Sequence, residues 1–222
     1  MRPMILGLTG AAGSGKDSVA DILVAKHGFQ RIAFADALYK EVSTAFNVPI
    51  TFLKTRETKE KRSARLSLGH CMEGEFAQVV RQIKHRGNRP IGHSNIPYPP
   101  RQILQWWGTE YRRAQRESYW IDKVRDRLLS GPDQDWVVTD VRFQNEADLV
   151  RELGGRLGLV TRPGVKPVAD HVSEAFWQTC NPDILIRNDG DIDDLMADVC
   201  AMVGQMLATH RVAAHCEYPS ER

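Results

Sequence analysis

The stretch "LTGAAGSGKDS", residues 8–18, decides the fold because it sets a glycine-rich loop between a strand pattern and a helix pattern. The apolar run "MILGL" (4–8) before it is typical of a buried parallel strand, and "KDSVADILVAKHG" (16–28) has helical spacing. From Gly10 to Lys16 the loop fits G-x-x-x-x-G-K, in which successive backbone N–H groups surround a phosphate at a helix N-terminus. A glycine-rich turn without a ligand is the alternative interpretation.

The last residues of this loop carry its charge. Lys16 is placed to reach the β- and γ-phosphates of a nucleoside triphosphate such as ATP. Asp17 follows, where a serine or threonine that holds Mg²⁺ is expected, and Ser18 lies about 100° further around the helix. A carboxylate about 4 Å from a phosphate oxygen is repelled by about 4 kcal/mol at an effective dielectric of 20. Asp17 therefore either binds Mg²⁺, directly or through water, or points outward and stabilises the helix dipole.

We predict that the triphosphate contacts the whole loop, which comprises Gly10, Ala11, Ala12, Gly13, Ser14, Gly15, Lys16, Asp17 and Ser18.

The composition indicates a globular protein of the cytoplasm. Of its 222 residues, 42% are hydrophobic and 26% are charged, and the net charge of +2 gives no field that favours polymeric nucleic acid as a partner. The four cysteines form no C-x-x-C pair, which indicates reduced thiols and no zinc site. Apolar runs are far shorter than the roughly 20 residues of a membrane span.

Strand and helix patterns alternate at both ends of the chain, which predicts an α/β fold with a five-stranded parallel sheet between helices. After the first strand we expect strands at 31–35, 135–140, 156–162 and 183–189, and a closing helix. No strand pattern is evident in the middle of the chain. We therefore predict a three-layer phosphate-binding-loop core over 1–46 and 135–210, a helical acceptor-binding or lid insertion over 47–134, and a frayed tail over 211–222.

The strand "DWVVTD" carries the second group of functional candidates. It ends at Asp140, at the edge of the sheet where α/β proteins bind ligands, so Asp140 is a second candidate for organising Mg²⁺. Arg142 is placed to neutralise phosphate charge, and Glu146 lies in the following turn. The alternative is an aspartate that caps the next helix, followed by a surface arginine.

Arginines and aromatic residues interleave in the predicted insertion. Arg101 and Arg113 lie close in sequence to Trp106 and Trp120, and arginine forks bind phosphates while aromatic faces stack on nucleobases. The alternative is a helix pair with an aromatic core and a solvated arginine face. The basic tract at 54–65 is either a solvated segment or a lid over phosphates. His171 lies in the connection between the last two predicted strands, which we expect to be a loop, and we expect this histidine to be structural.

These features predict phosphoryl transfer from ATP·Mg²⁺. An alcohol acceptor usually needs a carboxylate base, whereas a phosphate monoester is already largely dianionic and needs cations to offset repulsion. The arginine-rich insertion favours the phosphate acceptor. Asp36 is the one candidate base for an alcohol, and it serves equally well as a helix cap or a nucleoside contact.

Seven stretches together resemble phage-type deoxynucleoside monophosphate kinases. They are "GAAGSGKDS", "FADALYKEV", "PRQILQWWGTEYRR", "YWI", "VVTDVRFQNEADLV", "HVSE" and "RNDGDIDDL", in that order. The resemblance covers residues 4 to about 207 and is weakest over 47–97. An aspartate after the loop lysine is normal in that family, although Ala37 stands where a proline is expected.

The resemblance implies ATP-dependent conversion of deoxynucleoside monophosphates to diphosphates. It implies that Lys16 and Asp17 act at ATP·Mg²⁺, and that Asp140, Arg142 and Glu146 complete the catalytic site. The acceptor contacts expected from the same stretches are Phe34, Asp36, Lys40, Arg101, Gln105, Trp106, Arg113, Trp120 and Arg142.

Two rival functions stay open at this point. One is a kinase of another phosphorylated acceptor such as phosphomevalonate, which has no ring to stack on the aromatic insertion. The other is a non-catalytic ATP-binding module in DNA metabolism, which predicts nucleotide binding without turnover. The sequence also leaves open whether the chain forms a homodimer.

Overall fold

The computed structural model describes the chain apart from residues 1–2, 56, 86–94, 132, 166–171 and 217–222. The chain divides into two compact units. The sheet unit comprises Met1–Ala33 and Arg125–Arg222, and the helical unit comprises Phe34–Val124. No helix among the described residues is long and apolar enough to span a membrane.

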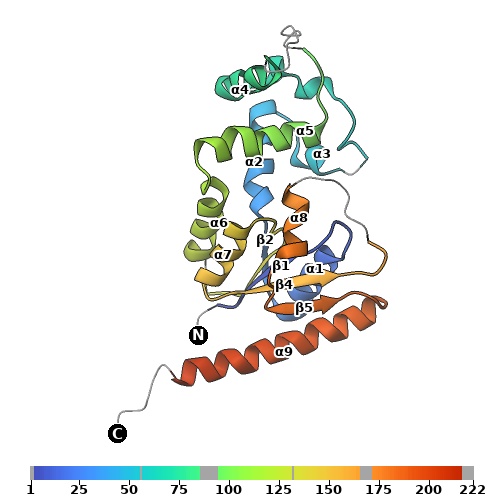
Figure 1. Cartoon of the computed structure of the whole chain (residues 1–222), viewed down its shortest axis with the longest axis vertical. Coiled ribbons are helices and arrows are strands. Elements are labelled where there is room, and N and C mark those ends of the chain that lie inside the picture. The colour runs from blue at the N-terminus through green and yellow to red at the C-terminus, as the bar shows by residue number, and fades with distance from the viewer. Residues whose placement is uncertain (1–2, 56, 86–94, 132, 166–171, 217–222) are drawn as a thin grey trace. The chain divides into compact units, whose positions relative to one another are not determined.

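The sheet unit is built on five parallel strands in the order β2-β3-β1-β4-β5 (Figure 1). This sheet confirms the predicted fold class. Its register places Leu6 beside Val137 on one side and beside Arg156 on the other, so β1 lies at the centre. The strands are β1 Ile5–Thr9, β2 Gln30–Ile32, β3 Trp136–Val138, β4 Arg156–Thr161 and β5 Ile184–Arg187.

Helices cover both faces of this sheet. The helices of the unit are α1 Lys16–His27, α7 Gln144–Glu152, α8 Val172–Thr179, α9 Ile192–Cys216 and the last turns of α6 Tyr119–Ser130. On one face, Leu6 and Leu8 are fully buried against α1 and α9. On the other face, a Cβ on Gly7 would meet Val150 of α7 at 3.0 Å, so α7 packs close to the central strand.

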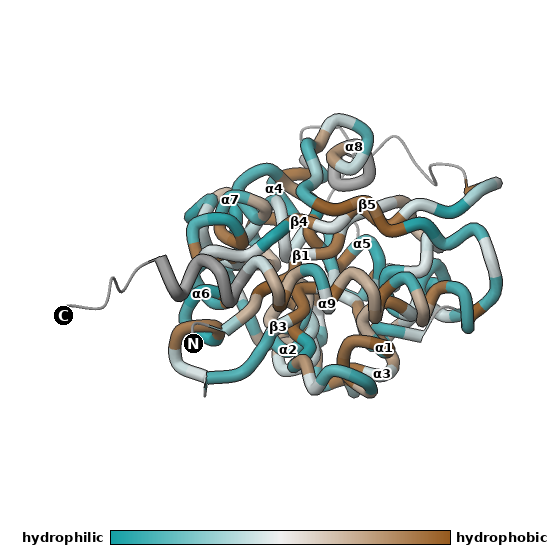
Figure 2. The backbone as a smooth tube through the Cα atoms, turned by 90° about the horizontal axis from the view of Figure 1, so that it is seen from below, coloured by the Kyte–Doolittle hydropathy of each residue, from teal (hydrophilic) through white to brown (hydrophobic). Residues whose placement is uncertain are grey.

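The hydropathy of the chain explains this layering. Hydrophobic stretches run along the strands, with α9 lying across them (Figure 2). Leu23 of α1 and Val199 of α9 are both fully buried in the same cluster. Burying each such side chain contributes about 1.5–3 kcal/mol, so this core fixes α1, and with it the glycine loop, against the sheet.

The helical unit contains helices and, among its described residues, one isolated bridge between Ser63 and Tyr98. Its core is aromatic, because Phe76 packs 4.6 Å from Trp107 and 5.7 Å from Tyr111, measured between ring centroids. The elements are α2 Phe34–Phe46, α3 Ile50–Lys54, η1 Ala64–Leu66, η2 Leu68–His70, α4 Gly74–His85, α5 Pro100–Gln105, the π-helix η3 Trp106–Arg113 and the start of α6.

Several elements differ from their predicted limits. The strand predicted over 31–35 ends at Ile32, and α2 begins at Phe34, because the buried Phe34 side chain belongs to the amphipathic face of the helix. Asp36 therefore lies in the first turn of α2 rather than at a strand end. The unit boundaries at Phe34 and Val124 differ from the predicted insertion of 47–134, because α2 packs with α3, α5 and η3.

Two further segments are more helical than predicted. The connection between β4 and β5 was expected to be a loop, but it contains α8. The closing helix α9 continues to Cys216 instead of ending near 210, so residues 211–216 of the tail predicted as frayed are helical.

Candidate active site

The glycine loop connects β1 to α1 with a backbone that only glycine adopts easily. Gly10, Gly13 and Gly15 have φ angles of 143°, 84° and 103°, all in the left-handed half of the map. A Cβ on Gly10 would also lie 2.3 Å from the carbonyl oxygen of Val160. These glycines let the loop turn back over the end of the sheet. All three positions therefore require glycine for the same reason, a positive φ angle.

Lys16 begins α1 and folds back over the loop. Its Nζ donates to the carbonyl oxygens of Gly10 at 2.7 Å and Ala11 at 2.8 Å. A triphosphate in the loop would offer charged acceptors, and hydrogen bonds between charged groups are about twice as strong as those between neutral ones. The ammonium is thus held beside the space where the predicted phosphates lie.

Asn188, at the carboxyl end of the edge strand β5, holds the loop in place. It follows β5 and is 9% exposed, and its Nδ2 donates to the carbonyl oxygen of Ser14 at 2.9 Å. The space behind Gly15 is filled by the same amide, since a Cβ there would lie 2.2 Å from Nδ2. Asn188 was not among the residues predicted from the sequence. Its position at the carboxyl end of a strand is the signal that would have found it.

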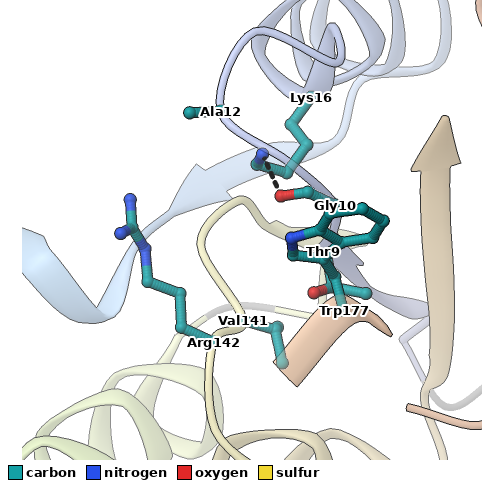
Figure 3. A pocket seen from close by; sticks show the side chains of 7 residues that line it. All are labelled: Thr9, Gly10, Ala12, Lys16, Val141, Arg142 and Trp177. Atoms are coloured by element: carbon teal, nitrogen blue, oxygen red, sulfur yellow. Dashed lines mark hydrogen bonds between the residues drawn. The ribbon is translucent and has the colours of Figure 1, made fainter. Parts of the chain in front are cut away.

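A small pocket opens beside the loop (Figure 3). Lys16 and Arg142 bring positive charge to it, and Trp177 of α8 adds an aromatic wall. Its lining consists of Thr9, Gly10, Ala12, Lys16, Val141, Arg142 and Trp177. The pocket therefore joins the two predicted groups, the loop and the segment after β3, through Gly10, Ala12, Lys16 and Arg142.

Arg142 stands on a short connection that is fixed at both ends. Val141 donates its backbone N–H to the Leu8 carbonyl oxygen at 3.1 Å, which extends the β3–β1 pairing. Glu146 is 2% exposed, and its Oε2 accepts the backbone N–H groups of Arg142 at 2.8 Å and Phe143 at 3.2 Å. The Glu146 carboxylate thus caps α7 and positions Arg142.

The predicted magnesium residues lie outside the pocket lining. Asp17 is 81% exposed and forms an ion pair with Arg31, which also contacts Asp21 at 3.0 Å. Asp140 follows Thr139, whose N–H pairs with the Ile32 carbonyl oxygen, so it stands at the carboxyl end of the sheet. Among the described residues, no three His, Cys, Asp or Glu side chains converge on one point.

These residues nevertheless fit Mg²⁺ bound together with a nucleotide. Mg²⁺ is usually held by one or two carboxylates, phosphate oxygens and waters rather than by an all-protein cage. Asp140 would supply one carboxylate, and Asp17 would supply a second only if it released Arg31. The metal assignment of both residues stays a prediction.

The predicted acceptor residues other than Arg142 belong to the helical unit. Two of them are ion-paired and exposed, since Arg101 contacts Glu60 and Asp36 accepts from Lys54 at 3.2 Å. Lys40 and Gln105 are also exposed, and Arg113 is half-buried.

The aromatic candidates are more buried. Phe34, Trp106 and Trp120 are 4%, 9% and 3% exposed, and Trp120 Nε1 donates to the Gly108 carbonyl oxygen at 3.1 Å. Their rings therefore shape the core of the unit, and their predicted substrate contacts stay untested.

Glu41 organises the π-helical segment and was not identified from the sequence. Its carboxylate accepts from Trp107 Nε1 at 2.9 Å, Arg112 Nε at 2.9 Å and Tyr119 Oη at 2.6 Å. Burial raises the pKa of Glu41, but these hydrogen bonds outweigh it and hold the pKa below its ordinary value. Burial and the bond to Glu41 raise the pKa of Tyr119 to about 12.

This cluster fixes Arg112, so the neighbouring Arg113 is carried on a rigid helix. π-Helical segments are rare and occur frequently at functional sites.

Two predictions fall on residues that the structure does not describe. Arg56 of the basic tract over 54–65 lies outside the described residues, as does His171.

Two sequence comparisons with known proteins point to the same family. A family model described as deoxynucleotide monophosphate kinase matches residues 58–199. A putative deoxynucleotide monophosphate kinase of Acanthamoeba polyphaga mimivirus is 27% identical over 219 residues, covering 90% of this chain and 96% of the relative. The deoxynucleoside-5′-monophosphate kinase of Escherichia phage T5 is 28% identical over 180 residues, covering 67% and 72%. Among solved structures, a gluconokinase from Sinorhizobium meliloti covers 97% of this chain and is itself covered completely, with 12% identity and a TM-score of 0.46.

Proposed function

The chain belongs to the deoxynucleotide monophosphate kinase family, and we propose that it transfers the γ-phosphate of ATP to the 5′-phosphate of a deoxynucleoside monophosphate. The products are ADP and the deoxynucleoside diphosphate. The observation that carries the proposal is the pocket in which Lys16 and Arg142 flank the glycine loop. Two cations beside a phosphate-binding loop suit a reaction that brings two phosphate groups together.

The sheet unit holds the ATP. The loop N–H groups and the N-terminus of α1 bind the phosphate oxygens, since both present partial positive charge. Lys16 exchanges its bonds to Gly10 and Ala11 for phosphate oxygens and offsets the charge that develops on the transferring group. Arg142, fixed by Glu146, offsets charge from the other side of the pocket.

Asp140 and Asp17 are the residues that would hold Mg²⁺ at the phosphates. The ion supplies charge neutralisation of the β- and γ-phosphate oxygens when bound. The role of Asp140 is supported by its place at the carboxyl end of β3, beside the connection that carries Arg142.

The helical unit holds the acceptor. Arg101 and Arg113 are the proposed contacts to its 5′-phosphate, because guanidinium groups bind phosphate through paired hydrogen bonds. Arg101 would exchange Glu60 for that phosphate, and Gln105 and Lys40 are further polar contacts. A phosphate acceptor is already largely dianionic at neutral pH, so no residue needs to remove a proton from it.

A coupled assay of ADP release tests this function. ATP·Mg²⁺ is offered with each deoxynucleoside monophosphate, each ribonucleoside monophosphate and phosphomevalonate, beside a Lys16→Met control. We expect turnover with at least one deoxynucleotide and its loss in the control. Turnover with phosphomevalonate alone, or nucleotide binding without turnover on any acceptor, would contradict the proposal.

A further inference from the structure

Trp177 is the aromatic wall of the pocket, and no role in the reaction has been assigned to it. It stands on α8, between β4 and β5, and lines the pocket together with Gly10, Lys16 and Arg142. Figure 3 shows the indole nitrogen on the edge of the ring that is turned toward the pocket, across from Arg142. The segment that was expected to be a loop therefore delivers a hydrogen-bond donor to the edge of the phosphate-binding loop.

The indole N–H of Trp177 is buried and has no hydrogen-bond partner among the described residues. Tryptophan N–H groups usually find a partner when they are buried, because an unpaired buried donor costs free energy. The indole nitrogen is a donor only, so its partner must be an acceptor. The pocket into which it points is the place for that acceptor.

We propose that the indole N–H of Trp177 donates a hydrogen bond to a phosphate oxygen of the bound nucleoside triphosphate. This inference rests on the proposed function, because that function places the triphosphate in the pocket. The lining favours a phosphate over a nucleobase, since Lys16 and Arg142 also bring cationic donors to the same space. Trp177 then closes the side of the pocket opposite Arg142 and helps to set the orientation of the phosphate chain.

The test uses the conservative variant Trp177→Phe, which keeps an aromatic ring but removes the donor. The matched control is Trp136→Phe, since the indole N–H of Trp136 is also buried and has no hydrogen-bond partner in the described part of the chain, but lies in the sheet, outside the pocket lining. Calorimetry measures the affinity of each full-length protein for ATP and for inorganic tripolyphosphate, which has the phosphates without the base. Thermal melting verifies that both variants are folded.

A hydrogen bond to a charged acceptor predicts that Trp177→Phe binds both ATP and tripolyphosphate about 10-fold to 100-fold more weakly. The Trp136→Phe control should bind both as the wild type does. Affinities of Trp177→Phe within twofold of wild type would overturn the proposal. A loss of affinity for ATP with unchanged affinity for tripolyphosphate would assign Trp177 to the nucleoside and would also overturn it.

A second readout reports the hydrogen bond directly. In ¹⁵N-labelled protein, the indole N–H resonance that is missing from Trp177→Phe belongs to Trp177. It should move downfield when tripolyphosphate is added, and an unmoved resonance at saturation would contradict the proposal. Binding of tripolyphosphate needs no acceptor and no turnover, so this result stays readable even if the kinase assay on wild-type protein fails.

Discussion

Replacing Asn188 by alanine removes the hydrogen bond that ties the end of β5 to the glycine loop. The bond runs from Asn188 Nδ2 to the Ser14 carbonyl oxygen at 2.9 Å, and the two residues are 9% and 1% exposed. Alanine leaves that buried carbonyl without this partner, which costs about 1–3 kcal/mol. For a chain of this size each kcal/mol lowers the melting temperature by about 2–4 °C.

The same bond holds the loop in the conformation that binds phosphate. If all of its free energy serves to populate that conformation, the affinity for ATP falls by about 5-fold to 150-fold. Calorimetry with ATP and thermal melting measure the two effects separately. Asn181→Ala is a suitable control because Asn181 is an exposed asparagine in the same unit.

We expect Asn188→Ala to lower both the melting temperature and the ATP affinity, and Asn181→Ala to change neither appreciably. A lower melting temperature with wild-type ATP affinity would show that the bond to Ser14 does not hold the loop for the nucleotide. Asn188 would then stabilise the sheet unit without preparing the loop for the nucleotide.

Substitutions of Lys16, of the Asp17–Arg31 pair and of Tyr119 test three further predictions. Lys16→Met should lower the turnover number by at least about 10²-fold with little change in melting temperature, as measured by the coupled assay, since one preorganised donor to a transition state contributes about that much. Asp17→Asn should raise the Mg²⁺ concentration needed for half-maximal turnover. Arg31→Gln should lower that concentration, because the Asp17 carboxylate then loses a competing cation. Unchanged Mg²⁺ dependence in both variants would favour the helix-dipole role of Asp17. The pKa of Tyr119 in the folded protein is about 12, above its ordinary value of 10. The neutral phenol therefore stabilises the fold fully below pH 10, and this stabilisation is lost as the pH rises toward 12. Below pH 10, Tyr119→Phe should have a free energy of unfolding about 1.5–3 kcal/mol lower than the wild type, because the hydrogen bond to Glu41 is lost. In denaturant titrations its free energy of unfolding should decline less between pH 10 and 12. A decline as steep as that of the wild type would contradict this assignment.

The parts of the fold that local patterns encode were predictable. The glycine loop has a fixed spacing, and β1, β3 and β4 are short apolar runs whose burial matches their hydropathy. The segment "RIAFA" was misassigned because so short an apolar run does not distinguish a strand from a helix start. Phe34 belongs to the helix, where it is one of the buried residues of α2, and it falls in the helical unit.

The missing site residues depend on contacts across long stretches of sequence. Trp177 reaches the pocket because β4 pairs with β1, which brings the α8 segment beside the loop. Asn188 contacts Ser14 across 174 positions of sequence. The role of Glu41 depends on the packing of α2 against η3 and α6, because Trp107, Arg112 and Tyr119 on those elements donate to its carboxylate.

The aromatic residues of the insertion show the limit of reasoning from composition. Interleaved arginines and aromatics suggested a surface that binds a nucleotide, yet Trp107 and Tyr111 are each 1% exposed and form the core. The local sequence does not distinguish these two uses, because an aromatic ring suits a core and a stacking face equally well.

The proposed reaction moves the γ-phosphoryl group of ATP to the phosphate of a deoxynucleoside monophosphate. Anion-exchange separation of a reaction with γ-³²P-labelled ATP tests it most directly. We expect labelled deoxynucleoside diphosphate and an equal amount of unlabelled ADP, and at least about 10²-fold less labelled diphosphate when Lys16→Met replaces the wild type. Label that appears only as inorganic phosphate, with the monophosphate unchanged, would contradict it.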